Sequence, residues 1–288
     1  MTRENRQGTK ENFSLVFCLI SHFSNMNLEK ICQQTIEVAQ EAGAFIAQES
    51  AKFQRSSVEY KDVNNVVSYV DKETEKLIVT NLRKIVAEAG FITEEGTAET
   101  SDSQGLNWII DPLDGTANFI HGLPNYSVSL ALAHGKDILV GVVYNVCTKE
   151  IFSATKSGGA FRNGEKIQVS PIKHLGESLL ATGFPYYKFE NQDKYLLILE
   201  SLMQKTHGLR RMGSAAIDLA YTACGYFDGF YEYNLNSWDM AAGILLVTEA
   251  GGFATDFSGG DNHLFGGDVV VGSAVHAELL AEIQRYWR

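Results

Sequence analysis

Between Tyr126 and Val169 the sequence consists of short apolar runs separated by turn residues. Two of the turns are His134-Gly135-Lys136-Asp137 and Arg162-Asn163-Gly164-Glu165, and an Asn-Gly pair favours a tight hairpin loop. Strands joined by such short loops pair as antiparallel neighbours. The segment therefore predicts an antiparallel meander in the middle of the chain.

Two amphipathic helices are predicted before the meander. Apolar residues recur at helical spacing over residues 27–45, which open on an asparagine, a common N-cap. A second helix is expected over residues 71–89, with Gly90 placed to end it. The runs at residues 91–93 and 108–110 are short and apolar, which is typical of buried strands.

After the meander, strand and helix patterns follow one another. We expect a strand at 178–181, helices at 191–205 and 214–224, a strand at 227–231, a helix at 238–250, strands at 253–255 and 269–272, and a last helix. This mixture favours an α/β (α+β) fold of layered sheets and helices over a helical bundle or a β-sandwich.

The chain start and the overall charge narrow the class of protein. Residues 1–26 are predicted to be an extension outside the fold, because their apolar stretch at 13–20 is too short to span a membrane and no cleavage site follows it. Residues 27–288 are expected to form one domain with subdomains of about 27–172 and 173–288. Acidic residues outnumber basic ones 35 to 24 and give a net charge of -11, so neither nucleic acid nor a membrane is an expected partner. The four cysteines show no paired spacing, and the expected location is the cytoplasm.

The most informative local motif is an apolar run that leads directly into two aspartates, Asp111 and Asp114, separated by a Pro-Leu step. One interpretation is an ordinary Pro-containing turn followed by Asp-Gly. The other is that the turn directs both carboxylates and the Leu113 carbonyl toward one point, while the amides of Gly115 and Thr116 open a short helix. Oxygen ligands suit Mg²⁺, and a helix N-terminus suits phosphate. The motif alone leaves both interpretations open.

Acidic residues follow a strand or open a helix at two further places. Glu94 and Glu95 come directly after the strand that ends at Thr93, and Asp239 lies in the first turn of a predicted helix. Taken singly, the glutamates fit a solvated surface and the aspartate fits the helix dipole. Together, such chain ends can converge on one crevice, where crowded carboxylates repel unless cations neutralise them. This arrangement predicts a divalent-cation site.

These motifs resemble the inositol monophosphatase family, within the wider group of lithium-sensitive, Mg²⁺-dependent phosphatases. Residues 108–121 match the family's first signature and residues 238–243 its second, while Glu94-Glu95 and residues 213–216 also lie where the family places them. The resemblance covers the chain from about Asn27 onward. It implies a layered αβαβα sandwich of the inositol monophosphatase and fructose-1,6-bisphosphatase type.

The resemblance also implies a role for each matched residue. Two or three Mg²⁺ ions would be held by Glu94, Asp111, Leu113 (through its carbonyl), Asp114 and Asp239. The catalytic residues would be Glu94, Thr116 and Asp71. Substrate contacts would come from Asp114, Gly115, Thr116, Gly213, Ser214, Ala215, Glu232 and Asp239. Lys61 would approach a loop metal or the phosphate.

The implied reaction is hydrolysis of a small phosphorylated polyol or sugar, with inositol monophosphate as the expected substrate and a metal-activated water as the direct nucleophile. Fructose 1,6-bisphosphate, 3'-phosphoadenosine nucleotides and histidinol phosphate are the rival substrates within the superfamily. The segment at 116–124 favours the inositol type, because the nucleotide phosphatases usually carry Lys after the motif Thr. A catalytically silent scaffold is the rival from another class, and the intact set of acidic residues argues against it. Inhibition by Li⁺ and a homodimer are also implied.

Overall fold

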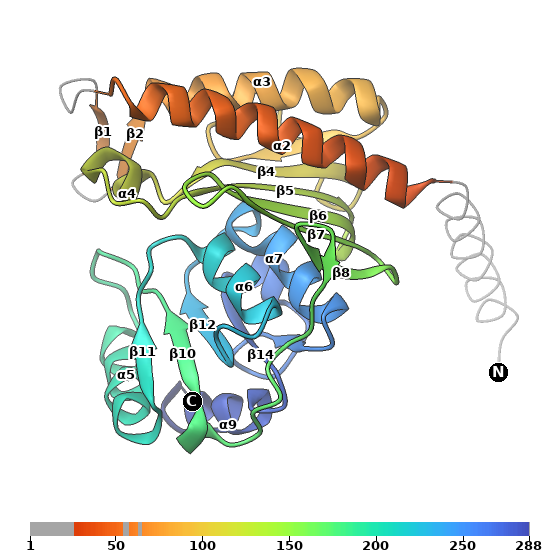
Figure 1. The fold of residues 1–288 in the computed structure, drawn as a ribbon. Coiled ribbons are helices and arrows are strands. Elements are labelled where there is room, and N and C mark those ends of the chain that lie inside the picture. The colour runs from red at the N-terminus through yellow and green to blue at the C-terminus, as the bar shows by residue number, and fades with distance from the viewer. Residues whose placement is uncertain (1–25, 54–57, 63–64, 288) are drawn as a thin grey trace, which may run out of the picture.

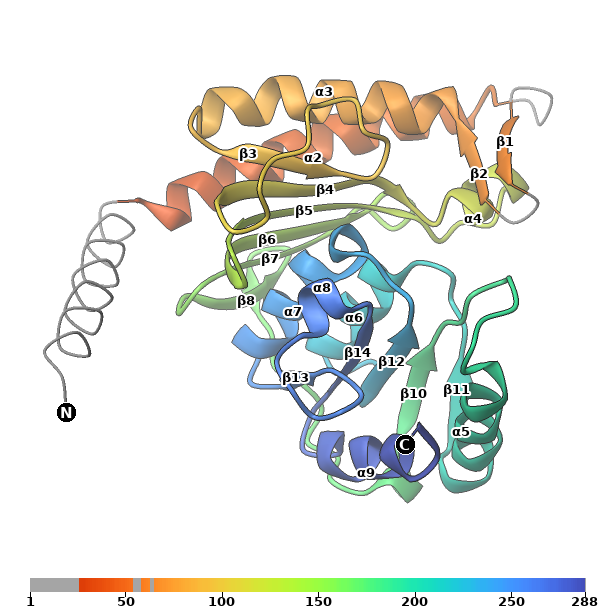
Figure 2. The ribbon, with the colours of Figure 1, turned by 180° about the vertical axis from the view of Figure 1, so that it is seen from behind.

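The computed structural model describes residues 26–53, 58–62 and 65–287, and this part of the chain forms five layers of alternating helix and sheet (Figure 1). One outer helical layer covers a seven-stranded sheet, a middle helical layer separates this sheet from a five-stranded sheet, and two more helices cover the far face of the second sheet (Figure 2). In this order, the helices are α2 (Leu28–Ser50), α3 (Tyr69–Ile85), α6 (Ala215–Ala223), α7 (Ser237–Glu249), α5 (Gln192–Lys205) and α9 (His276–Trp287). The predicted αβαβα sandwich is confirmed.

The first helical layer begins where the sequence predicts. The Asn27 side chain caps α2 by accepting a hydrogen bond from the Lys30 amide at 2.9 Å. Helix α3 starts two residues earlier than expected and ends at Ile85, and Gly90 is the first residue of a strand rather than the end of the helix. A glycine is required there because a Cβ would lie 2.1 Å from the Ser101 hydroxyl.

The seven-stranded sheet contains the predicted meander. Its order is β3-β4-β5-β6-β7-β8-β9, with β3 parallel to β4 and every later pair antiparallel. The strands are β3 (Gly90–Thr93), β4 (Leu106–Asp114), β5 (Ser127–His134), β6 (Asp137–Asn145), β7 (Glu150–Thr155), β8 (Gly159–Arg162) and β9 (Glu165–Lys166). Asn163 and Gly164, both at positive φ, form the predicted tight turn between β8 and β9.

The five-stranded sheet has the order β11-β10-β12-β14-β13 and mixed pairing. Its strands are β10 (Leu179–Thr182), β11 (Gly208–Arg210), β12 (Gly229–Tyr233), β13 (Phe253–Thr255) and β14 (Asp268–Gly272). Strands β10, β11 and β12 are parallel, whereas β14 is antiparallel to β12 and β13. The sequence interpretation missed the edge strand β11, whose three residues are too few to show a period. It also missed the hairpin of β1 (Val58–Asp62) and β2 (Asn65–Ser68) and the short helices η3 (Leu175–Glu177) and α8 (His263–Gly266).

Three apolar cores hold the layers together. The first lies between the α2/α3 layer and the seven-stranded sheet, and the third lies between the five-stranded sheet and the α5/α9 layer. The second surrounds α6 and α7, which are apolar on nearly every side because a sheet covers each of their faces. In α7 every residue from Met240 to Val247 is buried. The amino ends of these two central helices are therefore fixed by packing from both sides.

The described residues contain no helix that is long and apolar enough to cross a membrane. The predicted extension over residues 1–26 lies almost wholly outside the described residues and stays a prediction. The predicted subdomain boundary near residue 172 also stays a prediction.

Candidate metal and phosphate site

A bulge in β4 brings Asp111 and Asp114 to the same face of the sheet. Asp111 pairs with Ser129 and Asp114 pairs with Ser127, so three steps along β4 match two steps along β5. Side chains alternate between faces along a regular strand, and the extra residue restores the alternation so that both aspartates face one side. Proline is tolerated at such a bulge, where the ladder is interrupted. The predicted Pro-containing turn is thus part of a bulged strand.

Asp239 joins these two aspartates from the first turn of α7. One carboxylate oxygen from each of Asp111, Asp114 and Asp239 lies within 4.8 Å of the others. The three side chains come from segments more than 120 residues apart, and the packing of α7 against the seven-stranded sheet brings them together. A divalent cation is the ordinary partner of such a cluster of carboxylate oxygens.

Hydrogen bonds orient Asp114 and Asp239 and leave one oxygen of each available. The Oδ2 atom of Asp114 accepts from the Ser214 hydroxyl at 2.6 Å and from the Ala216 amide at 2.7 Å, at the amino end of α6. The Oδ2 atom of Asp239 accepts from the Asn236 amide at 2.6 Å. One oxygen of Asp239 therefore caps the amino end of α7, and the other is available to the aspartate cluster.

Glu94 supplies a fourth carboxylate with an unsatisfied oxygen. Its amide donates to the Ile110 carbonyl at 3.2 Å, which extends the pairing of β3 with β4 by one residue. Its Oε2 atom is buried and has no hydrogen-bond partner. A buried carboxylate oxygen without a partner costs free energy unless a cation or another donor satisfies it. This orphaned atom, beside the aspartate cluster, is what a cation site would explain.

The pKa values of these carboxyls are raised, chiefly by burial. Burial and the charges of neighbouring carboxylates raise the pKa of both Glu94 and Asp111 well above the usual range. Burial raises the pKa of Asp114 to about 6 against the hydrogen bonds from Ser214 and Ala216, and it raises that of Asp239 to about 7 with help from the charge of Asp114. Without a cation, the cluster is therefore stable only when it is partly protonated.

We expect the EDTA-treated protein to lose thermal stability as the pH rises from 5 to 8. The folded state keeps protons on Asp114 and Asp239 that the unfolded chain has already released, so the stability present below about pH 4 is lost as the pH rises through 6 and 7. Between pH 5 and 8 Asp114 contributes about one pKa unit and Asp239 about two, at about 1.4 kcal/mol per unit, so the melting temperature should fall by about 7 °C. Differential scanning calorimetry at several pH values checks this. Mg²⁺ should raise the melting temperature more at pH 8 than at pH 5, and a metal-free protein that gains stability over this range would contradict the expectation.

Thr116 is held at the edge of the cluster by two acceptors. Its hydroxyl lies 2.9 Å from Oδ1 of Asp71 and 3.0 Å from the Leu113 carbonyl oxygen. Asp71 belongs to the first turn of α3 and is buried. Since both partners accept, the hydroxyl proton points toward them and the oxygen lone pairs are turned to the remaining side. Thr116 also begins the short helix α4 (Thr116–His121), as the sequence predicts.

The segment over residues 213–215 lies next to the residues that open α4. A Cβ at Gly115 would lie 3.2 Å from the Gly213 carbonyl oxygen, and both glycines have positive φ angles. Ser214 caps α6 and links the segment to Asp114. The structure thus brings together the predicted phosphate-binding amides of residues 115 and 116 and the predicted substrate-binding segment.

Glu232 is at the end of β12 and faces the same region. Burial raises its pKa to about 8 against the opposing effect of Arg211, and the charges of Asp239 and Asp114 raise it further. Its carboxylate packs on the α carbon of Gly183, where a Cβ would lie 2.1 Å from Oε1. Glu232 is therefore about half protonated near pH 8 and mostly protonated below it, and in the protonated form it can both donate and accept hydrogen bonds.

The sequence interpretation missed residues that are not proposed ligands but hold the segments of the site in place. The Asn118 side chain donates to the carbonyls of Asn125 at 2.7 Å and Met212 at 3.0 Å, and Asn125 donates to Met212 at 3.1 Å. These bonds tie α4 to the 213–215 segment. Asn118 lies inside the matched first signature, but the buried Glu75 and Asp218 carry no signal in the sequence that distinguishes them from surface acids. Lys61 has a side chain outside the described residues, so its predicted role stays a prediction.

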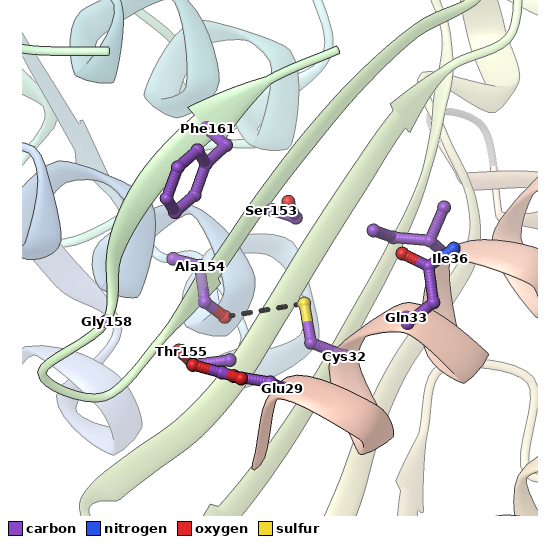
Figure 3. Close-up of a pocket in the computed structure, with 9 residues that line it drawn as sticks. All are labelled: Glu29, Cys32, Gln33, Ile36, Ser153, Ala154, Thr155, Gly158 and Phe161. Atoms are coloured by element: carbon purple, nitrogen blue, oxygen red, sulfur yellow. Dashed lines mark hydrogen bonds between the residues drawn. The ribbon is translucent and has the colours of Figure 1, made fainter. Parts of the chain in front are cut away.

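A separate pocket between α2 and strands β7 and β8 lacks the chemistry of this site. Its lining contains Cys32, whose Sγ points to the Ala154 carbonyl oxygen at 4.0 Å (Figure 3). Burial raises the pKa of the Cys32 thiol to about 11, and burial also raises the pKa of Cys147 and Cys224. A thiol of raised pKa is a poor nucleophile, so none of these three cysteines is a candidate nucleophile.

Comparisons with known proteins agree with this architecture and site. The model of the inositol monophosphatase family matches residues 27–288. The inositol-1-monophosphatase of Rhizobium meliloti is 40% identical over 248 residues, covering 86% of this chain and 93% of that protein. The Nus factor SuhB of Pseudomonas aeruginosa is 41% identical over 254 residues, covering 86% and 94%. The crystal structure of the extragenic suppressor protein suhB from Bartonella henselae superposes with a TM-score of 0.83 at 37% identity, covering 89% of this chain and 99% of that one. The chain therefore belongs to the inositol monophosphatase family of phosphatases.

Proposed function

We propose that this phosphatase hydrolyses inositol monophosphate to inositol and phosphate and that the reaction depends on Mg²⁺. The observation that carries the proposal is the cluster of Asp111, Asp114 and Asp239 oxygens within 4.8 Å of one another, with the orphaned Oε2 of Glu94 beside it. These residues, with the Leu113 carbonyl, would hold two or three Mg²⁺ ions. Bound Mg²⁺ would neutralise the carboxylates and the phosphate and would make water more acidic and hence more nucleophilic.

The residues of the chain then orient the reaction. The Thr116 hydroxyl points its proton to Asp71 and Leu113, so its lone pairs can accept a hydrogen bond from the attacking water. The Glu94 carboxylate would accept a second hydrogen bond from that water and so help to position it. The amides of Gly115 and Thr116 are placed to donate to phosphate oxygens. No side chain in this arrangement is needed as a covalent nucleophile.

The alcohol would be recognised by polar groups around the aspartates. The acceptors for ring hydroxyls would be Glu232, the backbone carbonyls of residues 213–215 and the free oxygens of Asp114 and Asp239, and Glu232 can also donate when it is protonated. A polyol such as inositol can satisfy several of these groups at once, since each hydroxyl both donates and accepts.

Glu232→Ala is expected to separate polyol recognition from hydrolysis. Loss of one hydrogen bond to a buried carboxyl should raise the KM for inositol monophosphate about tenfold, while the KM for phenyl phosphate, which has no ring hydroxyls, should change little. Steady-state kinetics with both substrates checks this. Glu165→Ala, which removes an exposed glutamate of β9, is the matched control and should change neither value. Equal changes for the two substrates would contradict the role of Glu232.

The experiment that tests the proposed function is a phosphate-release panel. Inositol monophosphate, fructose 1,6-bisphosphate, 3'-phosphoadenosine 5'-phosphate and histidinol phosphate are compared with Mg²⁺, with EDTA and with added Li⁺. Fastest Mg²⁺-dependent release from inositol monophosphate supports the proposal, and a faster rival ester replaces the substrate. Several relatives carry the name Nus factor SuhB, so a chain without turnover on any ester would point to a role as a silent scaffold instead.

Three further parts of the proposal rest on family membership. They are inhibition by Li⁺, a homodimer and a cytoplasmic location. The described cysteines, Cys32, Cys147 and Cys224, are unpaired, which suits a reducing compartment. The net charge of -11 argues against nucleic acid as a direct partner.

A further inference from the structure

Helix α3 contributes two buried carboxylates, one turn apart, that bond to two different segments of the metal and phosphate site. Asp71 accepts from Thr116, as described above, and Glu75 accepts from the turn that follows Glu94. Glu75 is fully buried. Its Oε2 accepts from the Glu95 amide at 2.8 Å, and its Oε1 accepts from the Thr97 amide at 2.7 Å and the Thr97 hydroxyl at 2.8 Å. A carboxylate can satisfy three donors in this way because it has no proton of its own to place.

Backbone and side-chain hydrogen bonds flank Glu94 on both sides in the chain. On one side of Glu94, the amide of that residue bonds to the Ile110 carbonyl. On the other side, the chain turns at Gly96, which has a φ of 65° and no atom within 4 Å of the place where a Cβ would be. Gly96 and Thr97 are exposed. Strand pairing before Glu94 and the Glu75 carboxylate after it therefore both help to fix the position of Glu94.

The charges around Glu94 make this support necessary. The charges of Asp239, Glu95 and Asp71 repel the Glu94 carboxylate, whereas Asp111 shares a hydrogen bond with it. An ion bound there would require the carboxylate within about 0.5 Å of one position. A turn free to shift would move Glu94 away from the other carboxylates. Hydrogen bonds from backbone amides to a buried carboxylate are among the stronger ones, so Glu75 can hold the turn against this repulsion.

We propose that Glu75 is a positioning residue, which sets the affinity of the site for divalent cations by holding the Glu95–Thr97 turn and through it the Glu94 carboxylate. The inference rests on the proposed function only in that it takes Glu94 as a metal ligand. Residues that orient metal ligands typically affect affinity or activity 10- to 100-fold.

The test is Glu75→Gln, with Mn²⁺ binding to the metal-free protein as the main measurement. A glutamine has one acceptor oxygen, and its NH₂ group would face an amide N–H, so at least one of the three hydrogen bonds is lost. Titration calorimetry or the Mn²⁺ electron paramagnetic resonance signal should show about 10-fold to 100-fold weaker binding. The Mg²⁺ concentration for half-maximal phosphate release should rise by a similar factor, whereas the KM for substrate at saturating Mg²⁺ should stay near the wild-type value.

Glu249→Gln is the matched control. The Glu249 carboxylate also accepts hydrogen bonds from two backbone amides of a turn, those of Ser157 at 2.7 Å and Gly159 at 2.9 Å, but this turn is remote from the site. The Glu249→Gln variant should lower the melting temperature about as much as Glu75→Gln does, but it should not weaken Mn²⁺ binding. If Glu249→Gln weakened Mn²⁺ binding equally, the effect would be general destabilisation and the proposal would be overturned.

If Glu75→Gln does not fold, Thr97→Val is the alternative variant for testing the proposal. It removes only the hydroxyl bond to Glu75 at an exposed position and should weaken Mn²⁺ binding several-fold. Wild-type Mn²⁺ affinity in Thr97→Val, or in folded Glu75→Gln, overturns the proposal. A wild-type protein that binds no Mn²⁺ would instead refute the metal site itself, and the inference with it.

Discussion

Asp111→Asn should lower phosphate release from inositol monophosphate by about 10³-fold or more while the fold stays intact. Asp111 is buried, lies between Glu94 and Asp114 and shares the 4.8 Å cluster with Asp239. A cation in such a site contributes several kcal/mol to transition-state stabilisation, and each 1.4 kcal/mol is a factor of ten in rate. An amide in place of the carboxylate removes one charge from the cluster without changing its shape. Stopped-time phosphate assays over a range of Mg²⁺ concentrations measure the loss.

The same variant makes a second prediction that separates lost chemistry from lost structure. Oδ1 of Asp111 accepts from the Leu113 amide at 3.0 Å, and the asparagine oxygen can keep this bond. Because one repelling charge is gone, the metal-free variant should melt higher than the metal-free wild type at pH 8. Asp137→Asn, an exposed aspartate of β6 paired with Lys156, is the control and should leave both activity and stability nearly unchanged. Normal turnover in Asp111→Asn would sink the assignment of the metal site.

The parts of the fold that could be predicted are those whose signal is local. Helix α2 is predictable because its N-cap and its helical period are both local sequence patterns. The β5–β9 meander is predictable because its turn residues are local patterns as well. The end of α3 was placed wrongly at Gly90, because that glycine is required by the approach of Ser101 and not by the end of a helix. Strand β11 was missed, since three residues at a sheet edge carry no period.

The candidate site divides in the same way. Its acidic residues could be selected because they follow strands or open helices, where side chains from different segments converge. The bulge that turns Asp111 and Asp114 to one face could not be predicted, because it is defined by pairing with Ser127 and Ser129 on another strand. Glu75 was not recognised either, since a glutamate in an amphipathic helix is ordinary until its partners, twenty residues away, are known.

The position of α3 predicts that its two buried carboxylates affect different properties of the enzyme, namely the rate and the metal requirement. Asp71 and Glu75 are fixed relative to each other by one helical turn, and both are buried. Under the proposed mechanism, Asp71 would act through Thr116 on the attacking water, and Glu75 would act through the Glu94 turn on cation binding. A variant at one of these positions should therefore change the rate at saturating metal, and a variant at the other should change the amount of metal required.

Thr116→Val should lower kcat by about 100-fold or more without weakening Mn²⁺ binding. Valine has nearly the shape of threonine but lacks the oxygen whose lone pairs are turned away from Asp71 and the Leu113 carbonyl, so a water there loses the acceptor that orients it. The Thr116 side chain is not a proposed metal ligand, so calorimetric Mn²⁺ affinity should stay within a few-fold of the wild type. Thr116→Ser keeps the hydroxyl and should recover most of the rate. Because Asp71 acts through this hydroxyl, Asp71→Asn should lower kcat in the wild type but add little further loss in the Thr116→Val background. A Thr116→Val enzyme that loses metal affinity in parallel with kcat would show that Thr116 supports the cation site and not the attacking water.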